Sequence, residues 1–440
     1  MQTIVIVGGG AGGLELATRL GDSMGRAGTA RIVLVDRWPA HFWKPLLHTV
    51  ASGKRDAKAA QIDYAAQACE HGFEFHRGEV LGVERAARCI RLAPWLTDDG
   101  VEVLPERTLG YDKLVLALGA VTNFFGVPGA SEHVLTLDDV PQAQAFHQRF
   151  IDGCIQASAR NAAGHSGEAG ETGLDIVIVG GGATGVELAA ELSHSARTLA
   201  RYKVHALDPV RHVRIRLLER GPLLLPHLHP RLSKRAARHL RSLGITVCVD
   251  TAVQRVEEHA VVDNEGRVFP SSMTLWAAGV EAPAMCATLG LAVNRLRQIA
   301  VLPSLQSMDD PAIYAIGDCA SFVCPIQGTV PPRAQAAHQQ AMFLAQALVQ
   351  IPEHGDNESR AAFAYRDYGS LVSLGPHAAV GVLAATVGGR NWQVGGPLAR
   401  WLYSLMYRKH LMALHGFVRM AARTVADWIG EKISPSVKLH

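Results

Sequence analysis

Two glycine-rich stretches have the residues needed to hold the pyrophosphate of a dinucleotide. In the first, TIVIVGGGAGGLELATRL, an apolar strand runs into Gly8, Gly10 and Gly13 and then into a helix. Gly8 permits a tight turn, Gly10 lets the backbone approach a phosphate, and Gly13 lets the helix pack closely on the strand. The N–H groups and the positive end of the helix dipole then bind the phosphates. The next strand, RIVLVD, ends at Asp36, which can accept hydrogen bonds from ribose hydroxyls.

The pattern recurs in LDIVIVGGGATGVELAAEL, with Gly180, Gly182 and Gly185. Its second strand, IRLLE, ends at Glu219 and follows the glycines at a greater distance than in the first copy. We therefore expect an inserted segment, a longer helix through RTLARYKVHAL. A Glu at this strand end favours the 2′-hydroxyl of NADH and repels the 2′-phosphate of NADPH. Arg220, next in sequence, keeps NADPH open as the alternative.

Two such motifs predict two α/β domains that each bind a dinucleotide. One interpretation is hydride transfer between a nicotinamide and a flavin, because no protein side chain can accept a hydride. The strands in YDKLVLALGAVTNFFGVPG and MTLWAAGVEAP stop at turns with Gly119 and Gly279, where the chain is expected to cross between the domains. A further strand, AIYAIGDCA, ends beside Asp318. This acid suits the ribityl and pyrophosphate region of FAD, or it caps the following helix, and both roles can hold together.

The composition of the chain agrees with a globular α/β enzyme. Its 440 residues predict two or three domains, and it is 48% hydrophobic and 19% charged. The net charge of +3 is too small to indicate nucleic-acid binding. Seven dispersed cysteines without a CxxC pair indicate a reducing compartment, and we disfavour Cys319 and Cys324 as a redox dithiol. A strand directly after Met1 leaves no room for a signal peptide, and no apolar run reaches the ~18 residues of a membrane span.

The C-terminal stretch 395–432 has the pattern of an amphipathic helix at a membrane surface. Trp401, Leu405 and Met412 recur at helical spacing, basic residues interrupt each long apolar run, and Gly416 is placed to separate two helices. From Arg400 to His440 there are seven basic residues and two acids. They are Arg400, Arg408, Lys409, Arg419, Arg423, Lys432 and Lys438. The alternative is an ordinary helix packed on the enzyme or on a second subunit.

Over nearly its whole length the chain resembles the type II NADH:quinone oxidoreductases, a family of flavoproteins with two dinucleotide-binding domains. The glycine motifs are common to the wider superfamily. The resemblance also covers HFWKPLLHTVASG (41–53) and AIGDCA, and its far more specific parts lie in AQAAHQQA and FAYRDYGSLVSLGPHAAVG (363–381). One position departs from the family, because Thr49 stands where PLLHEVA usually has an acid.

The resemblance implies a role for each motif residue. Non-covalent FAD would be bound by Gly8, Gly10, Gly13, Asp36, Lys44, Gly119 and Asp318. NADH, the substrate, would be bound by Gly180, Gly182, Gly185, Glu219 and Gly279. Glu187 would sit near the nicotinamide and flavin rings, where it handles protons or, alternatively, only stabilises its helix as a first-turn carboxylate. Gln335 and Gln339 would line the quinone site, while His338 and Gln340 are assigned to packing or solvent.

The expected fold class is α/β, with two Rossmann-like domains and a C-terminal amphipathic membrane-attachment region. The expected domains are 1–127 and 299–388 for FAD, 128–298 for NADH with an insert at about 160–173, and 389–440 for attachment. The expected reaction moves two electrons from NADH to ubiquinone or menaquinone without proton pumping, at the cytoplasmic face of a bacterial-type plasma membrane. The partners are NADH, quinone and an anionic membrane surface, with a homodimer left open.

Two other functions remain as alternatives. A sulfide:quinone oxidoreductase needs cysteines at the flavin, and none follows Cys324 in this chain. A redox-sensing, NADH-binding flavoprotein would bind the same nucleotides without rapid turnover.

Overall fold

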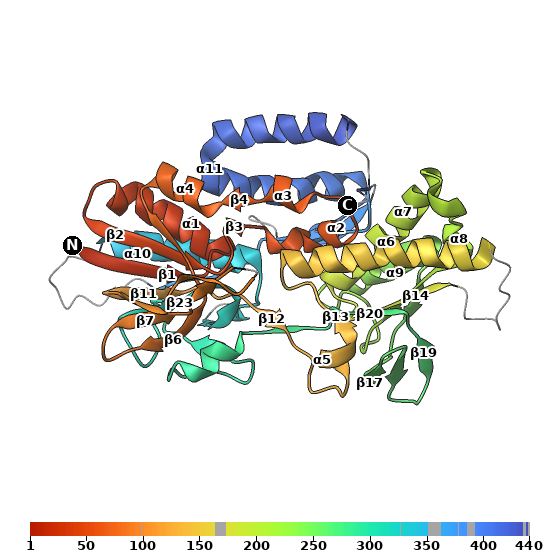
Figure 1. Cartoon of the computed structure of the whole chain (residues 1–440), viewed down its shortest axis with the longest axis horizontal. Coiled ribbons are helices and arrows are strands. Elements are labelled where there is room, and N and C mark those ends of the chain that lie inside the picture. The colour runs from red at the N-terminus through yellow and green to blue at the C-terminus, as the bar shows by residue number, and fades with distance from the viewer. Residues whose placement is uncertain are drawn as a thin grey trace. The chain divides into compact units, whose positions relative to one another are not determined.

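The structure is a computed structural model in which the chain forms two compact units (Figure 1). Unit 1 comprises Met1–Trp43, Gln61–Val121 and Val280–Asp367, and unit 2 comprises Lys44–Ala60, Thr122–Gly279 and Tyr368–His440. The described residues are 1–97, 99–162, 173–325, 327–350, 362–376, 378–384, 392–433 and 437–438. Most of the insert expected at about 160–173 lies outside them. The assignment of ligands to domains stays a prediction.

Unit 1 is built on a five-stranded sheet in the order β23-β11-β1-β2-β5. Every neighbouring pair is parallel. The strands are β1 Gln2–Val7, β2 Ala30–Asp36, β5 Glu74–Arg77, β11 Lys113–Leu116 and β23 Ile313–Ala315. β1 and β2 are mostly buried aliphatic residues, as expected for a parallel sheet covered on both faces.

The helices of unit 1 pack closely where the sequence has small residues. α1 spans Ala11–Leu20 and α10 spans Ala334–Gln350. A Cβ on Gly12 would lie 3.2 Å from the carbonyl oxygen of Ala337, so glycine allows the two helices to approach. The apolar residues Leu14, Leu16, Ala17 and Leu20 of α1 are fully buried. Unit 1 also contains α4 Tyr64–His71 and an antiparallel sheet of β6 Val80–Glu84, β7 Cys89–Leu92 and β10 Arg107–Gly110.

Unit 2 repeats the parallel arrangement in the order β13-β20-β14-β15-β16. The strands are β13 Val134–Leu135, β14 Leu174–Val179, β15 Val213–Leu218, β16 Thr246–Cys248 and β20 Met273–Trp276. Its long helices are α6 Val140–Ala162, α7 Ala183–Arg201 and α9 Pro230–Ser242. A small antiparallel sheet contains β17 Val253–Glu257, β18 Ala260–Asp263 and β19 Val268–Pro270.

The delay before Glu219 arises from a longer helix, as expected, but α7 ends at Arg201 instead of continuing through RTLARYKVHAL. Lys203 and His205 adopt positive φ angles, which an α-helix cannot accommodate. Asp208 then caps a new short helix, α8 Pro209–His212, by accepting backbone N–H groups. The insertion is therefore one extended helix followed by short turns.

The C-terminal part of unit 2 is a sheet covered by a broken helix. β27 Gly369–Ser373, β28 Ala379–Leu383 and β29 Trp392–Gly395 form an antiparallel sheet, and α11 Pro397–Ile433 packs on it. Gly416, with φ 73°, interrupts α11, so the predicted separation into two helices is confirmed. Figure 1 shows the two arms of α11 in blue as adjacent helices. Among the residues that the structure describes, no helix is long and apolar enough to span a bilayer.

Lys438 ties the end of the chain to two segments of unit 2. Its N–H donates to the carbonyl oxygen of Gly53 at 2.9 Å, and its carbonyl oxygen lies 2.9 Å from His147 Nε2. Its Nζ donates to Asp56 at 3.0 Å, which lowers the pKa of that carboxyl. The C-terminal residues thereby hold the turn that follows α2 (Leu47–Ala51).

Candidate functional site

The first glycine motif forms the turn between β1 and α1. Gly8 has φ 101°, and a Cβ on Gly13 would lie 1.9 Å from the carbonyl oxygen of Gly8, so neither position tolerates a side chain. The N–H groups of Gly9 and Trp38 donate to Asp36 at 2.6 and 2.8 Å. Burial raises the pKa of Asp36, and these backbone bonds oppose the rise.

The space around Gly10 fits a bound pyrophosphate. A Cβ at this position would meet no atom within 4 Å, and no side chain caps the start of α1. The first N–H groups of the helix therefore point to open space at its positive end. Tyr64 and His41 hold the turn from the other side, because both contact the carbonyl oxygen of Gly9, at 2.7 and 2.8 Å. These observations fit the FAD expected at this motif.

The second motif reproduces this geometry in unit 2. A Cβ on Gly185 would lie 2.0 Å from the carbonyl oxygen of Gly180, whereas one on Gly182 would meet nothing within 4 Å. Glu219 accepts the N–H groups of Gly181 and Gly221, each at 2.7 Å. The start of α7 also lacks a side-chain cap. Unit 2 thus holds a second glycine turn of the kind expected to bind a dinucleotide, with Glu219 next to the end of β15. We call each of these two turns, with the helix start that follows it, a cradle.

The remaining residues expected at the nucleotides occupy several places. Gly119 follows β11 in unit 1 with φ 69°. Asp318 lies in the turn after β23, where the side chain of Gln298 donates to its carbonyl oxygen at 2.8 Å. Lys44 belongs to unit 2, where it pairs with Asp138 at 3.4 Å. Gly279, also in unit 2, accepts the N–H of Asn123 at 3.0 Å.

Glu15 and Glu187 are both buried near the start of their helices. Glu15 is 0% exposed, and its carboxylate contacts Arg19 at 2.8 Å and His338 at 2.6 Å. His338, which we assigned to packing or solvent, therefore joins α10 to α1 in unit 1. Both partners can carry a positive charge, which suits a buried carboxylate.

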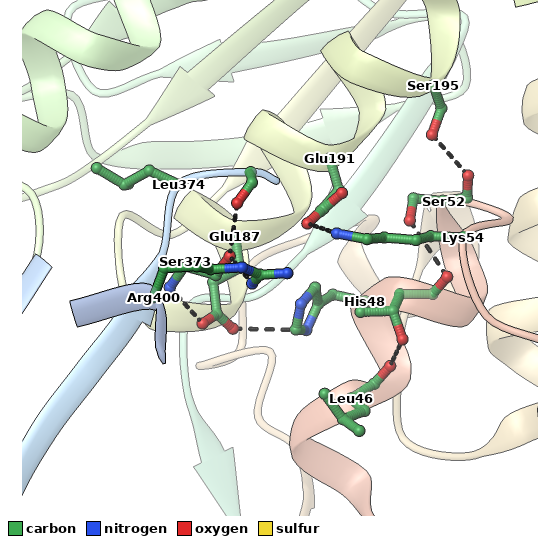
Figure 2. Close-up of polar contacts among 12 residues, drawn as sticks. Leu46, His48, Ser52, Lys54, Glu187, Glu191, Ser195, Ser373, Leu374 and Arg400 are labelled. Carbon is green, nitrogen blue, oxygen red and sulfur yellow. Dashed lines mark hydrogen bonds and ion pairs between the residues drawn. The ribbon is translucent and has the colours of Figure 1, made fainter. Parts of the chain in front are cut away.

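Glu187 has a different set of partners, all within unit 2 (Figure 2). The N–H of Ser373 on β27 donates to its Oε1 at 2.9 Å. Nδ1 of His48 on α2 lies 3.4 Å from its Oε2, and the hydroxyl of Tyr403 on α11 also hydrogen-bonds to it. Glu187 is 6% exposed. Arg400 reaches this region indirectly, because it donates to the hydroxyl of Ser373 at 3.1 Å.

Burial determines the protonation states of Glu187 and His48. It raises the pKa of Glu187 to about 8, although the bonds from Ser373 and Tyr403 work in the opposite direction. It lowers the pKa of His48 to about 4. Near neutral pH the carboxyl is therefore mostly protonated and the imidazole is neutral. Although the two groups lie within ion-pair distance, at neutral pH the contact joins two mostly uncharged groups.

A second buried acid lies one helical turn further along α7. Glu191 is 3% exposed, and Lys54 Nζ donates to its carboxylate at 2.8 Å. Burial acts to raise the pKa of Glu191, but the charge and hydrogen bond of Lys54, together with the charges of His48 and Arg400, outweigh burial, so the pKa is lowered. The hydroxyl of Ser195 donates to the carbonyl oxygen of Ser52 at 2.7 Å, so α7 and the turn after α2 are joined at two points (Figure 2).

Sequence reasoning missed the partners of Glu187, namely His48, Ser373 and Tyr403, and it also missed the neighbouring pair of Lys54 and Glu191. One local signal was present: Glu187 and Glu191 share a face of an otherwise apolar helix segment, VELAAEL. Thr49, at the position of the usual family acid, donates to the carbonyl oxygen of Leu46 at 2.6 Å.

The two glutamines expected at the quinone contact the chain beyond α10. Gln335 Nε2 donates to Asp367 at 3.0 Å. The amide of Gln339 donates to the carbonyl oxygen of Arg366 at 2.8 Å and accepts its N–H at 3.0 Å. Gln340, which we expected to be uninvolved, is 1% exposed and accepts the N–H of Gly317 at 2.7 Å.

α11 presents apolar side chains to solvent along both arms. The exposed members are Leu398, Trp401, Met406, Met412, Phe417, Val418, Val425 and Ile429. Leu411 and Leu414 of the same helix are buried, which makes the helix amphipathic in the expected sense. A pocket of ≈ 390 Å³ lies at the start of the helix. Its lining residues are Pro376, Pro397, Arg400, Trp401 and Ser404.

Comparison with known proteins gives matches along the whole chain. A family model described as pyridine nucleotide-disulphide oxidoreductase matches residues 2–341. The type II NADH:quinone oxidoreductase of Haemophilus influenzae is 36% identical and covers 100% of both chains. The type II enzyme of Mycobacterium tuberculosis is 26% identical over 97% of this chain and 87% of its own.

Solved structures with different activities share the fold. NDH2 from Plasmodium falciparum, in complex with NADH, has a TM-score of 0.81 at 19% identity and covers 99% of this chain and 100% of its own. The sulfide:quinone oxidoreductase of Aquifex aeolicus has a TM-score of 0.68 at 18% identity, covering 98% and 95%. At these identities the likeness supports the fold alone.

The chain belongs to the pyridine nucleotide-disulphide oxidoreductase family, the class that the two cradles define. Within that family, its full-length similarity at 36% identity places it among the type II NADH:quinone oxidoreductases. The predictions of the family, of the α/β fold class with two Rossmann-like sheets and of the enzyme class are confirmed.

Proposed function

We propose that the chain binds NADH on unit 2 and FAD on unit 1 and transfers two electrons from NADH to a membrane quinone. The observation that carries this proposal is the pair of complete cradles. Each has an open position over the second glycine and a helix start without a side-chain cap. Bound FAD would supply the chemistry that side chains lack, by accepting a hydride and passing on electrons.

Glu219 supports NADH as the preferred nucleotide. Its carboxylate accepts two backbone N–H groups, which hold it in place at the strand end. A negative charge there suits ribose hydroxyls and opposes a 2′-phosphate. Arg220 is exposed and is the residue that could soften this preference.

Glu187 is proposed to hold the proton that quinone reduction consumes. Reducing a quinone by two electrons also takes up two protons. A carboxyl with a pKa of about 8 carries a proton at neutral pH and can release it during turnover. The alternative, a helix-stabilising first-turn carboxylate, is less well supported because a mostly protonated acid gains little from the helix dipole.

The quinone contacts of Gln335 and Gln339 remain proposals that rest on the family resemblance. Gln339 already uses both ends of its amide on the backbone of Arg366. A quinone oxygen would therefore have to replace one of these hydrogen bonds. Gln335 is the better candidate of the two for a quinone contact. Its bond to Asp367 joins two side chains, so breaking it would not disturb a backbone hydrogen bond.

α11 is proposed to attach the enzyme to an anionic membrane at the cytoplasmic face of a bacterial-type plasma membrane. Its exposed aromatic and aliphatic side chains alternate with Lys409 and Arg419, which are also exposed. Apolar insertion and attraction to anionic lipid headgroups then act together, and each basic residue contributes about 1 kcal/mol near the surface. We propose peripheral attachment without proton pumping.

Steady-state turnover tests the proposal directly. Purified, FAD-loaded enzyme is assayed with NADH or NADPH as donor and with a short-chain quinone or with sulfide plus quinone. We expect rapid quinone reduction by NADH, slower reduction by NADPH and no sulfide oxidation. Failure to reduce any quinone with NADH would remove the proposal. In sealed vesicles, uncoupler-sensitive acidification by this protein alone would contradict the absence of pumping.

A further inference from the structure

Two buried carboxyls share one face of α7, and only one of them forms an ion pair with a lysine. Glu187 and Glu191 are separated by one helical turn, so their carboxyls are neighbours. Lys54 Nζ lies 2.8 Å from Glu191, whereas the nearest groups to Glu187 are a backbone N–H, a tyrosine hydroxyl and His48. The surroundings of the two acids therefore differ chiefly in the position of Lys54, which contacts Glu191 and not Glu187.

Two buried carboxylates this close cannot both ionise without a large repulsion. An adjacent ammonium group decides which of them keeps the charge, since it stabilises the carboxylate form of its partner. The charge thus belongs on Glu191 and the proton on Glu187. Such a separation of two acids by their surroundings is how enzymes assign one group to hold a proton and the other to remain ionised.

We propose that Lys54 and Glu191 are positioning residues for Glu187: the ion pair fixes the negative charge on Glu191, so that Glu187 is the carboxyl that carries and releases the proton. This inference deepens the proposed function and rests on it for its catalytic meaning. Neither Lys54 nor Glu191 needs to touch a substrate. Their effect reaches the reaction only through the protonation of Glu187.

The other groups that face Glu187 do not replace Lys54 in this arrangement. His48 is buried, and its Nε2 has no hydrogen-bond partner among the described residues, so a positive charge there would be costly. Arg400 on α11 bonds to the hydroxyl of Ser373, and its charge lowers the pKa of both Glu187 and Glu191, so it does not distinguish between them. Tyr403 offers only a hydroxyl. His194, further along α7, is itself influenced by Glu191 and Lys54.

The geometry makes opposite predictions for the two members of the ion pair. E191Q removes the neighbouring negative charge and leaves the Lys54 cation, so the titration of Glu187 shifts down by about one pH unit. K54M removes the lysine cation and leaves only Arg400, whose charge acts on both carboxyls, so the last proton of the pair is lost about one pH unit higher. K54R and the double variant K54M/E191Q restore the charge balance and stay within a few tenths of a unit of wild type.

The experiment measures these midpoints in two ways on the full chain with FAD bound. Infrared spectroscopy follows the C=O band of the buried carboxylic acid against pH without NADH or quinone, with E187Q used to assign the band. The pH dependence of kcat with NADH and a soluble quinone provides the second measurement. Opposite shifts in E191Q and K54M, both reversed in the double variant, support the inference.

Shifts of the same sign, or unchanged midpoints in both single variants, would overturn it. If K54M does not fold, E191Q together with the double variant decides, because an unchanged midpoint in E191Q has the same meaning. If the wild type fails to reduce quinone, the proposed function is lost, but the infrared midpoints still report whether Lys54 and Glu191 control Glu187.

Discussion

Glu15 and Glu187 occupy the same position in the two cradles, as the second residue after Gly13 and after Gly185. Both are buried acids near the start of a helix. In the first cradle the residue one turn later is Arg19, which pairs with Glu15, and in the second it is an acid, Glu191. One substitution of charge at equivalent positions therefore separates a carboxylate with basic partners from a carboxyl that keeps its proton.

The comparison shows how a repeated fold acquires a chemical difference. The backbone geometry of the two turns is nearly the same, including the carbonyl that blocks a side chain at the third glycine. What differs is the surface against which each helix packs. α1 packs on α10, which supplies His338, whereas α7 packs on α2 and β27, which supply mostly neutral hydrogen-bond groups. The residue one turn along each helix and the elements that pack on it, rather than the glycine turn, therefore determine the chemistry.

The largest expected effect comes from filling the close approach in either cradle. G13A and G185A each place a Cβ about 2 Å from a carbonyl oxygen, and we expect a loss of about 3 kcal/mol in the free energy of unfolding. The matched controls are G10A and G182A, where the added Cβ has open space. The controls should fold normally but bind FAD or NADH more weakly. Urea unfolding and flavin absorbance measure both effects; equal stability of G13A and G10A would contradict the packing argument.

The next effect distinguishes the two glutamates. E187Q should lower quinone-dependent kcat roughly 10²-fold, since it removes a general acid–base group. E15Q should leave kcat nearly unchanged and instead cost about 2 kcal/mol of stability, because Arg19 and His338 lose a charged partner. Stopped-flow kinetics and denaturant unfolding are measured on both variants. If E15Q impaired turnover as much as E187Q, the proposed division of roles would be wrong.

The pH dependence of stability should reflect the shifted pKa values of Glu187 and His48 in the second cradle. The raised pKa of Glu187 (about 8) means that the folded state binds its proton more tightly than the unfolded state, so stability falls as pH rises from about 4.5 to about 8. The lowered pKa of His48 (about 4) gives the opposite slope between about 4 and 6.5. The two nearly cancel below pH 6.5, and above it a loss of about 2 kcal/mol remains.

Unfolding free energies between pH 5 and 8.5 check this dependence. E187Q should remove the decline above pH 6.5, while H48Q should extend it to lower pH, because the opposing slope is gone. E15Q serves as the control in the first cradle and should keep the wild-type decline. A decline that persisted unchanged in E187Q would assign it to another group.

The smallest effect concerns the acids at the two strand ends. E219Q should reduce the preference for NADH over NADPH about tenfold, as repulsion of the 2′-phosphate is removed. D36N, the equivalent change in the first cradle, should weaken FAD retention without altering nucleotide preference. The ratio of kcat/KM for the two nucleotides measures the first effect, and flavin content after dialysis measures the second. An unchanged ratio in E219Q would contradict the role of Glu219, and Arg220 would be the next residue to test.

The cradles could be predicted from the sequence because their determinants are local. Gly8, Gly13 and Asp36 belong to one strand–helix–strand segment, so their spacing alone encodes the turn and the acid that closes it. The same holds for the interruption of α11 at Gly416, where one residue with a positive φ decides the outcome. Confirmed predictions concentrate in such segments.

The environment of Glu187 could not be predicted in this way. Its partners His48, Ser373 and Tyr403 come from three distant parts of the chain and meet only through tertiary packing. The sequence shows two acids on one helix face, but it does not show that Lys54 lies beside one of them and stabilises its ionised form. The same limit applies to Gln339, whose amide reads as available for a ligand until the backbone of Arg366 is placed beside it.

The contacts of Lys438 link a distant segment of the chain to the pair of acids on α7. This residue is bonded to Gly53 and Asp56, on either side of Lys54. A substitution of Lys438 that removes its bond to Asp56 would therefore act on the turn that supplies the ammonium group to Glu191. Such a change is expected to alter the titration of the α7 carboxyls, although Lys438 contacts neither of them.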